Sequence, residues 1–261
     1  MDTEALKSAL TDTPVSVWHA FDEIGSTNDE ALRWIDADAP DMALVIAERQ
    51  TSGRGRFTRR WVTEPGVALA FTAILRPTKE EAKTITSLYA PMAGLAVWQA
   101  LREELGLTAQ IKWPNDVLLE RRKCCGILAE AAWTGDKLNG IVLGIGINVS
   151  AGSLPPESDA LFAATYLEKY TAAPVNRWAL LAAVARNLAY WRGQLGSAEF
   201  LATWQDNLAF KGEQVRVEQA GDPLLSGKLT GVDCRGNLLL RDASGATIIA
   251  EVGDVHLRSA S

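Results

Sequence analysis

Apolar residues in the first third of the chain follow two spacings, one typical of strands and one typical of helices. Three apolar runs have the length and composition of buried strands: Val15–Phe21, Ala43–Glu48 and Val67–Leu75. Between the first two, the segment GSTNDEALRWI has helical spacing. A capping box of Thr27 and Glu30 predicts that a helix begins there.

The middle of the chain predicts a long helix followed by a meandering sheet. Helical spacing runs from about Glu80 to Leu105, and Gly106 after it is typical of a residue that ends a helix. Four strand-like runs follow: Gln110–Trp113, Val117–Leu119, Cys124–Trp133 and Leu138–Val149. Two further helices are predicted, at Arg177–Leu195 and Ser197–Asn207. Together these elements predict an α+β domain with a mixed, mostly antiparallel sheet.

The pattern changes sharply at Lys211. From Gly212 onward the chain gives short β-runs, separated by Gly-Asp, Arg-Gly-Asn and Ser-Gly turns: QVRVEQ, LSGKLTGV, NLLLRD and TIIAEV. Such a run of short strands is typical of a small SH3-like β-barrel. We therefore expect two domains, a larger one over residues 1–210 and the barrel over residues 211–261.

Composition adds limits on location and on metal binding. The 261 residues are 48% hydrophobic, which is enough for a large core. No apolar run is long enough to span a bilayer and the polar, acidic N-terminus is unlike a signal peptide, so we expect a cytoplasmic protein without a membrane partner. Three cysteines and two histidines show no zinc-type spacing, which leaves any metal ligands unknown. Cys124 and Cys125 lie in an apolar run, where strand packing is favoured over redox chemistry.

A basic loop, Gln50–Trp61, stands out because the whole chain is acidic, and it is called the arginine loop below. Five arginines fall within the twelve residues from Arg49 to Arg60, although the net charge is -6. In this run, QTSGRGRFTRRW, Gly53 and Gly55 allow close approach of the backbone, and arginine forks bind phosphate or carboxylate. The local charge favours one small anion over general polyanion attraction. A solvated basic loop or a nucleic-acid contact is the alternative.

The pentapeptide KWPND, Lys112–Asp116, predicts a rigid corner at the end of a strand. The corner would hold the lysine and the aspartate on either side of it. Lys123 begins a strand that a hairpin would pair with the first, so two lysines could converge near the arginines. Gathered cations would need an anion such as a triphosphate with a carboxylate. Taken singly, an ordinary hairpin turn and a hairpin-tip lysine explain these residues as well.

Two further short segments suit a polar ligand. GSTN, Gly25–Asn28, places two hydroxyls and an amide at a helix N-terminus, which fits ligand binding as well as simple capping. GIGIN, Gly144–Asn148, resembles a dinucleotide fingerprint only superficially, since no helix follows it. Its glycines indicate a strand that admits either a bulky neighbour or a ligand lying on the sheet.

In this order, the segments EIGSTNDEA, AERQTSGRGRFTRRW, KWPNDVLLERRKCCGIL and GIGIN resemble the biotin protein ligases. The resemblance implies a class II aminoacyl-tRNA-synthetase-like catalytic domain followed by the SH3-like barrel. It implies an enzyme that uses ATP, Mg²⁺ and biotin to form biotinyl-5'-AMP. The biotin then passes to one lysine of a biotin carboxyl carrier domain, as in acetyl-CoA carboxylase. Attack of a carboxylate on the α-phosphate mainly needs orientation and neutralised charge, which agrees with the lack of histidine in the motifs.

The resemblance also implies roles for individual residues. The residues expected to act in catalysis are Lys112, Arg56, Lys123 and Asp116. The residues expected to contact biotin are Ser26, Thr27, Asn28, Gln50, Gly53, Arg54, Arg56, Lys123 and Gly126. The residues expected to contact ATP are Arg54, Arg59, Trp61, Lys112, Asn115 and Asn148. Within these sets, Lys123 would meet the biotin carboxylate and Asp116 would orient the incoming lysine.

Two positions of the arginine loop depart from the family's pattern. Phe57 stands where many members have another arginine, and Thr58 stands where they commonly have glycine. In the family this loop closes over the adenylate. We therefore expect a stiffer or differently shaped loop here, with slower exchange of the intermediate.

Two other functions compete with biotin ligation. A lipoate–protein ligase of the same superfamily would also adenylate a small carboxylic acid, but KWPND and the arginine loop favour biotin. A noncatalytic nucleic-acid-binding protein is opposed by the acidic net charge. Only about fourteen residues precede the first predicted strand, too few for a helix-turn-helix domain, so we expect no DNA partner. A homodimer is left open.

Overall fold

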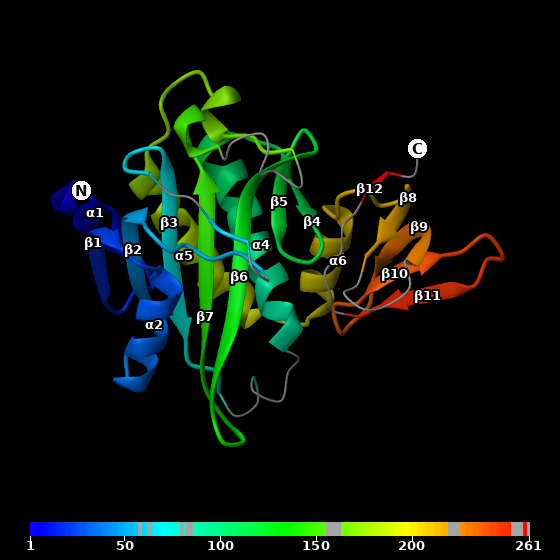
Figure 1. Cartoon of the computed structure of the whole chain (residues 1–261), viewed down its shortest axis with the longest axis horizontal. Coiled ribbons are helices and arrows are strands. Elements are labelled where there is room, and N and C mark those ends of the chain that lie inside the picture. The colour runs from blue at the N-terminus through cyan, green and yellow to red at the C-terminus, as the bar shows by residue number, and fades with distance from the viewer. Residues whose placement is uncertain are drawn as a thin grey trace.

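The strands of the chain form two separate sheets. The computed structural model describes residues 1–56, 59–61, 64–78, 81, 86–154, 163–218, 225–251 and 258–259. Within these residues the larger sheet has the strand order β1-β2-β3-β7-β6-β5-β4, and the smaller has the order β11-β10-β9-β8-β12. Figure 1 shows them side by side, with helix α6 (Ala198–Asp206) between them.

The larger sheet is mixed. Its strands are β1 (Trp18–Ile24), β2 (Ala43–Gln50), β3 (Ala68–Leu75), β4 (Gln110–Lys112), β5 (Asp116–Leu119), β6 (Arg122–Thr134) and β7 (Lys137–Asn148). Strand β1 runs parallel to β2, and the remaining neighbours in this sheet are antiparallel. The predicted α+β class with a mixed, mostly antiparallel sheet is therefore confirmed.

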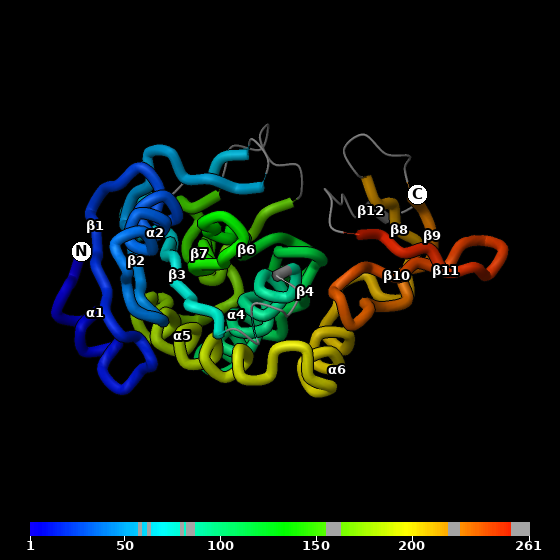
Figure 2. Tube along the Cα trace, turned by 90° about the horizontal axis from the view of Figure 1, so that it is seen from below, coloured from blue at the N-terminus to red at the C-terminus, as the bar shows by residue number. Residues whose placement is uncertain are grey.

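Helices cover both faces of the larger sheet. On one face lie α1 (Thr3–Leu10), α4 (Tyr89–Leu105) and α5 (Arg177–Gly193), and on the other lies α2 (Thr27–Asp36), as Figure 2 shows. Short 3-10 helices are η1 (Thr86–Leu88), η2 (Ala151–Ser153) and η4 (Leu167–Lys169). Within the described residues, no helix has both the length and the apolar character to cross a membrane.

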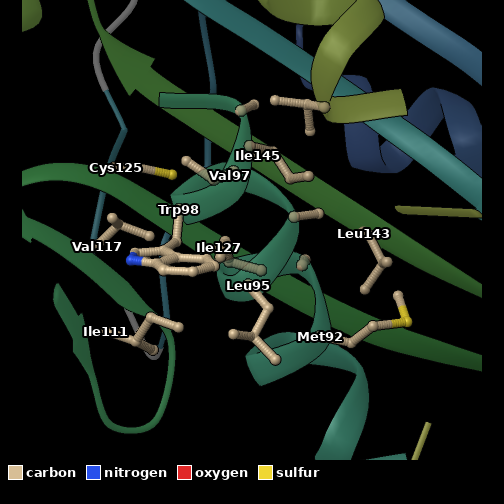
Figure 3. Close-up of a cluster of buried hydrophobic side chains, with 14 of the residues drawn as sticks. Met92, Leu95, Val97, Trp98, Ile111, Val117, Cys125, Ile127, Leu143 and Ile145 are labelled. Carbon is tan, nitrogen blue, oxygen red and sulfur yellow. The ribbon is translucent and has the colours of Figure 1, made fainter. Parts of the chain in front are cut away.

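The two covered faces explain why the central strands are apolar throughout. Along β2, Leu44 and Ile46 belong to the main core, whereas Ala43 and Val45 belong to a smaller cluster beneath α2. In the main core, Trp98 of α4 lies against the sheet near Ile127 (Figure 3). The face beneath α4 and α5 is therefore filled with side chains, and α2 covers only part of the opposite face.

The adjacent cysteines belong to this packing. Both Cys124 and Cys125 are fully buried, and Cys125 points into the core beside Val97 and Val117 (Figure 3). Burial raises the pKa of the Cys124 thiol to about 12 and raises that of Cys125 well above its ordinary value. Neither thiol is available as a nucleophile, which confirms the packing role predicted for them.

The smaller sheet is built from the C-terminal residues and meets the KWPND corner. Its strands are β8 (Gln214–Val217), β9 (Leu225–Val232), β10 (Leu238–Arg241), β11 (Thr247–Ala250) and β12 (Arg258–Ser259). The indole N–H of Trp113 donates to the carbonyl oxygen of Gly236, in the turn between β9 and β10, at 2.7 Å. The hydroxyl of Ser87 donates to the carbonyl of Arg235 at 2.8 Å. These bonds fix the barrel against the corner; the domain boundary between residues 210 and 211 stays a prediction.

Three local predictions need correction or fall outside the described residues. The predicted capping box is wrong, because α2 is capped by Ser26, whose Oγ accepts a hydrogen bond from the backbone N–H of Asp29 at 3.4 Å. Helix α1 was not anticipated. The long helix begins at Tyr89 after η1, and residues 80 and 82–85 of its predicted first part are not described. Phe57 and Thr58 also lie outside the described residues.

We predict that Trp113→Phe lowers the free energy of unfolding by about 1–2 kcal/mol, because the carbonyl of Gly236 loses its buried donor. Urea unfolding followed by circular dichroism measures the change. Trp133→Phe is the matched control, since Trp133 is 53% exposed. Equal stability of the two variants would show that the bond between corner and barrel contributes nothing.

Candidate active site

A cavity opens on the face of the larger sheet opposite α4 and α5. It lies between the start of α2, the end of β2, the arginine loop and the strands β5, β6 and β7. The side chains and backbone around it are those of Ser26, Thr27, Asn28, Gln50, Arg54, Gly55, Arg56, Arg59, Arg60, Trp61, Phe71, Asn115, Asp116, Lys123, Gly126, Ile127, Leu128, Gly144, Ile145 and Gly146. Five stretches that are separate in the sequence therefore meet at one place.

One end of the cavity is polar and carries no net charge. Thr27 and Asn28, in the first turn of α2, are each only 4% exposed. The backbone N–H of Thr27 donates to Gln50 Oε1 at 2.9 Å, and the Thr27 hydroxyl lies 3.1 Å from the same oxygen. The hydroxyl of Thr72, on β3, lies 2.6 Å from Asn28 Oδ1 and 2.8 Å from Thr27 Oγ1. These groups form a connected set that can recognise a neutral polar ligand.

Glycines of β7 leave room for two of the side chains around the cavity. A Cβ atom on Gly144 would lie 2.2 Å from Asn28 Oδ1, and one on Gly146 would lie 2.3 Å from the Trp61 ring. Any side chain at either position would displace its neighbour. The Trp61 indole N–H is buried, and no acceptor faces it among the described residues. A bound ligand could supply that acceptor.

The opposite end of the cavity is cationic and is organised by one carboxylate. The β4–β5 pairing places Lys112 opposite Asp116, with Lys112 Nζ 3.3 Å from Asp116 Oδ2. From β6, Lys123 Nζ lies 2.6 Å from Asp116 Oδ1. Burial alone would raise the pKa of Asp116, but the ammonium groups of Lys123 and Lys112 outweigh it and hold that pKa below its ordinary value. The triad therefore carries one net positive charge.

The corner that carries Lys112 and Asp116 is also hydrogen-bonded to β6 through Asn115. Asn115 donates from Nδ2 to the carbonyl of Ile127 at 2.6 Å, and the Ile127 N–H donates back to the Asn115 carbonyl at 2.9 Å. The peptide bond between Trp113 and Pro114 is cis. Asn115 is thus both a cavity residue and a structural link, because its amide is held by the neighbouring strand.

The described part of the arginine loop folds back on itself beside the cavity. Trp61 N–H donates to the Gly53 carbonyl at 2.9 Å, and Gly55 N–H donates to the Arg59 carbonyl at 2.8 Å. A Cβ on Gly53 would lie 2.3 Å from the Trp61 carbonyl oxygen, so only glycine fits there. Arg54 is held by two acidic side chains, Asp29 and Glu130, at distances of 2.7–2.9 Å.

Most of the predicted site residues converge on this cavity, and three lie behind it. Gly53 supports Trp61, and Lys112 reaches the cavity through Asp116. Asn148, only 3% exposed, donates from its side chain to the Thr165 carbonyl at 3.0 Å instead of lining the cavity. The functional roles assigned to all these residues stay predictions.

The sequence analysis missed two side chains that support the polar end. Thr72 is fully buried in the apolar run ALAFTAIL, and a lone hydroxyl in such a run was a usable signal. Glu130 accepts hydrogen bonds from Asn28 and Arg54. It had no comparable signal, because one carboxylate in the exposed half of a long strand is common.

Comparison with known proteins places the chain in a family. Residues 21–148 match the model of the Biotin/lipoate A/B protein ligase family, and residues 210–258 match that of the Biotin protein ligase C terminal domain. The biotin--[acetyl-CoA-carboxylase] ligase of Paracoccus denitrificans is 33% identical, with 86% of this chain and 94% of that protein covered. The enzyme of the same name from Mycobacterium tuberculosis is 32% identical, with 99% and 96% covered. This chain belongs to the biotin protein ligase family.

A solved structure agrees with the family assignment. The biotin protein ligase from Aquifex aeolicus, in complex with biotin and ATP, has a TM-score of 0.80 to this chain and is 28% identical. The match covers 94% of this chain and 100% of that one. The sequence predicts a ligase catalytic domain followed by a small C-terminal β-domain. The similarity to this ligase structure confirms that fold.

We predict that Gly146→Ala displaces the Trp61 ring and loosens the arginine loop, which is bonded to Trp61 through Gly53. Trypsin should then cleave within Arg54–Arg60 about tenfold faster than in the wild type, because local opening sets the cleavage rate. Gly193→Ala is the control, since a Cβ there meets nothing within 4 Å. Equal cleavage of the two variants would contradict the idea that the missing side chain of Gly146 supports Trp61 and the loop.

Proposed function

We propose that this ligase joins biotin to one lysine of a biotin carboxyl carrier domain, through biotinyl-5'-AMP. The observation that carries the proposal is the division of one cavity into a neutral polar end and a cationic end. Biotin has a neutral ureido ring at one end and a carboxylate at the other. The ring suits the hydroxyl and amide groups of Thr27, Asn28 and Gln50, and the carboxylate suits the lysines.

The first step needs charge neutralisation more than proton transfer. A carboxylate oxygen of biotin attacks the α-phosphorus of ATP, the bond from that phosphorus to its bridging oxygen breaks, and diphosphate leaves. Both reactants are anions, so they repel one another without nearby cations. Lys123 would face the biotin carboxylate, and Lys112 with Arg59 would face phosphate oxygens, where they stabilise the charge of the transition state. The indole N–H of Trp61 would donate to the nucleotide.

The second step is acyl transfer to an amine. The acceptor lysine, as the free amine, attacks the acyl carbon of the mixed anhydride; an amide bond forms, the bond to the AMP oxygen breaks, and the amine gives up a proton. Asp116 remains ionised because its pKa is lowered. Asp116 would help to orient the incoming lysine amine through the two lysines that it holds at its oxygens. The acceptor is proposed as the carrier domain of a biotin-dependent enzyme such as acetyl-CoA carboxylase.

Mg²⁺ would enter as part of the MgATP substrate. Among the described residues, no three His, Cys, Asp or Glu side chains are grouped in a way that holds a metal ion. Asp116 faces a lysine with each of its oxygens, so it is not an available ligand. These residues do not fit a protein-held Mg²⁺ site, and phosphate oxygens would provide the ligands instead.

The competing functions are less well supported by the same geometry. Lipoate also has a carboxylate, but it lacks a ureido ring for the polar end. A nucleic acid would meet a loop in which Arg54 is already paired with Glu130 and Asp29. The cytoplasmic location, the absence of a DNA partner and the state of association stay predictions.

Transfer of labelled biotin tests the proposed function directly. The protein is incubated with labelled biotin, MgATP and a biotin carboxyl carrier domain, and label on the carrier is measured. Label should appear only when the target lysine is present, and replacing that lysine with arginine should abolish it. Turnover with lipoate alone would contradict the proposal, as would salt-sensitive DNA binding without ATP–diphosphate exchange.

We predict that Lys112→Ala lowers the rate of biotin adenylation by about 100-fold, because a cation at the transferred phosphate is lost. Biotin affinity, measured by calorimetry, should change by less than about threefold. Lys137→Ala, at the exposed first residue of β7, is the matched control and should keep the wild-type rate. Equal loss of adenylation and of biotin binding would contradict a role in the transition state.

A further inference from the structure

Glu48 is a buried carboxylate at the point where β2 leads into the arginine loop. Its side chain is 7% exposed, and it shares a face of β2 with Leu44 and Ile46, beneath α4 and α5. Arg177, the first residue of α5, donates from Nη1 to Glu48 Oε2 at 2.8 Å and from Nη2 to Oε1 at 3.0 Å. The two side chains therefore form a two-bonded ion pair behind the cavity.

The same ion pair holds the chain where it returns from the loop. The backbone N–H of Gly66 donates to Glu48 Oε2 at 2.9 Å, and Arg177 Nη1 also donates to the carbonyl of Ala68, at the start of β3, at 3.0 Å. Gly66 has a φ of +80° within the sequence EPGV, which is typical of a type II turn. The chain that leaves β2 and the turn that leads back into β3 thus meet at one ion pair.

Glu48 keeps its negative charge in this setting. Burial alone would raise its pKa, but the hydrogen bonds from Arg177 and from the Gly66 N–H outweigh burial and hold that pKa below its ordinary value. Removing one partner of a buried ion pair leaves the other charge uncompensated in a place that excludes water. Glu48 and Arg177 therefore act as a unit, and a change in either one reaches the turn at Gly66.

The position of this turn limits how far the arginine loop can open. At its beginning the loop is held by the end of β1, since the Thr51 N–H donates to the Ile24 carbonyl at 2.9 Å. At its other end Trp61 borders the cavity and lies close in sequence to Gly66. The part of the loop that borders the cavity is therefore suspended between two fixed points, and Glu48 provides the second.

A ligase that makes a mixed anhydride must keep it from water until the acceptor amine arrives. The arginine loop forms one wall of the cavity, so opening of the loop would expose a bound adenylate and let it leave. We propose that Glu48 and Arg177 are positioning residues that hold the return of the arginine loop and so slow the release of the adenylate intermediate. The inference rests on the proposed function, which supplies that adenylate. Both residues act through Gly66 and Ala68 instead of touching the ligand.

Release of biotinyl-5'-AMP tests the role of the pair. Labelled adenylate is bound to the protein without an acceptor, and its loss is followed after excess unlabelled adenylate is added. Glu48→Gln should release it about tenfold faster than the wild type, because one amide oxygen replaces two carboxylate oxygens and the charge of Arg177 is left unbalanced. Biotin affinity, measured by calorimetry, should change by less than about threefold, since the groups at the polar end are held by bonds to one another.

Two control variants separate positioning from a general loss of stability. Val184→Ala shortens a fully buried side chain in the same helix as Arg177, so it lowers stability without removing a bond to the loop. Glu104→Gln is the matched ion-pair control, because it neutralises the partner of Arg186 between α4 and α5. Both controls should release the adenylate at the wild-type rate.

Substitutions of Arg177 test the pair from its other side. Arg177→Lys keeps the positive charge, but its single nitrogen cannot reproduce the bonds of the arginine fork to both Glu48 oxygens and the Ala68 carbonyl. Release should be about threefold faster in Arg177→Lys and about tenfold faster in Arg177→Met. Combining Arg177→Met with Glu48→Gln should add less than about twofold to the faster single variant, because the two residues act as a unit.

Three outcomes would overturn the role of the pair. The first is a wild-type release rate in folded Glu48→Gln. The second is an equal acceleration in Val184→Ala at the same loss of stability, measured by urea unfolding, because general loosening would then explain both. If Glu48→Gln does not fold, Arg177→Lys decides, and a wild-type release rate in that variant is the third.

A separate measurement distinguishes failure of this inference from failure of the proposed function. A wild type that forms and binds no biotinyl-5'-AMP would contradict the proposed function. Trypsin cleavage within Arg54–Arg60, measured without ligand, would still test the pair, because local opening of the loop sets the cleavage rate. Cleavage should be about tenfold faster in Glu48→Gln than in Glu104→Gln, and equal rates would overturn the inference.

Discussion

The Asp116 carboxylate is the interaction on which the rest of the site depends. It lies between the ammonium groups of Lys112 and Lys123, which come from strands on either side of β5. Two ammonium groups in a buried cleft repel each other strongly, and leaving either uncompensated would cost several kcal/mol. One carboxylate between them offsets most of that cost, while the group as a whole keeps a single positive charge. That remaining charge is what an anionic ligand or transition state can use.

The sheet supplies this arrangement because short strands meet a long one. Strands β4 and β5 are joined by the KWPND corner, and their pairing puts Lys112 and Asp116 opposite each other. Strand β6 then pairs Asp116 with Gly126, whose missing side chain leaves room for Lys123 and Trp61 within 3.0 Å of the Cβ position. The C-terminal sheet holds the corner from outside through Trp113. A domain distant in sequence thus contributes to the rigidity of the cationic end.

Features set by a few neighbouring residues could be predicted from the sequence, and features set by strand pairing could not. The KWPND corner, the glycines of GIGIN and the basic loop carry their geometry locally, so their meeting at one cavity followed from recognising them in order. Glu130 owes its role to Asn28 and Arg54, which are 102 and 76 residues away in the chain. No local pattern encodes such contacts. The helix cap fell between these cases, because Ser26 and Thr27 are both good caps and only the backbone decides between them.

The division of the cavity into two ends also explains why its loop is so basic in an acidic protein. At the polar end the arginine charge is more than offset, since Arg54 is paired with the two carboxylates of Glu130 and Asp29. At the other end Asp116 leaves one positive charge on the lysines, and Arg56 and Arg59 border the same cavity. A uniform anion would gain little at the polar end, and a neutral molecule would gain little at the cationic end. A ligand with a neutral hydrogen-bonding ring and an anionic tail interacts favourably with both, and the placement of the acidic residues selects for that combination.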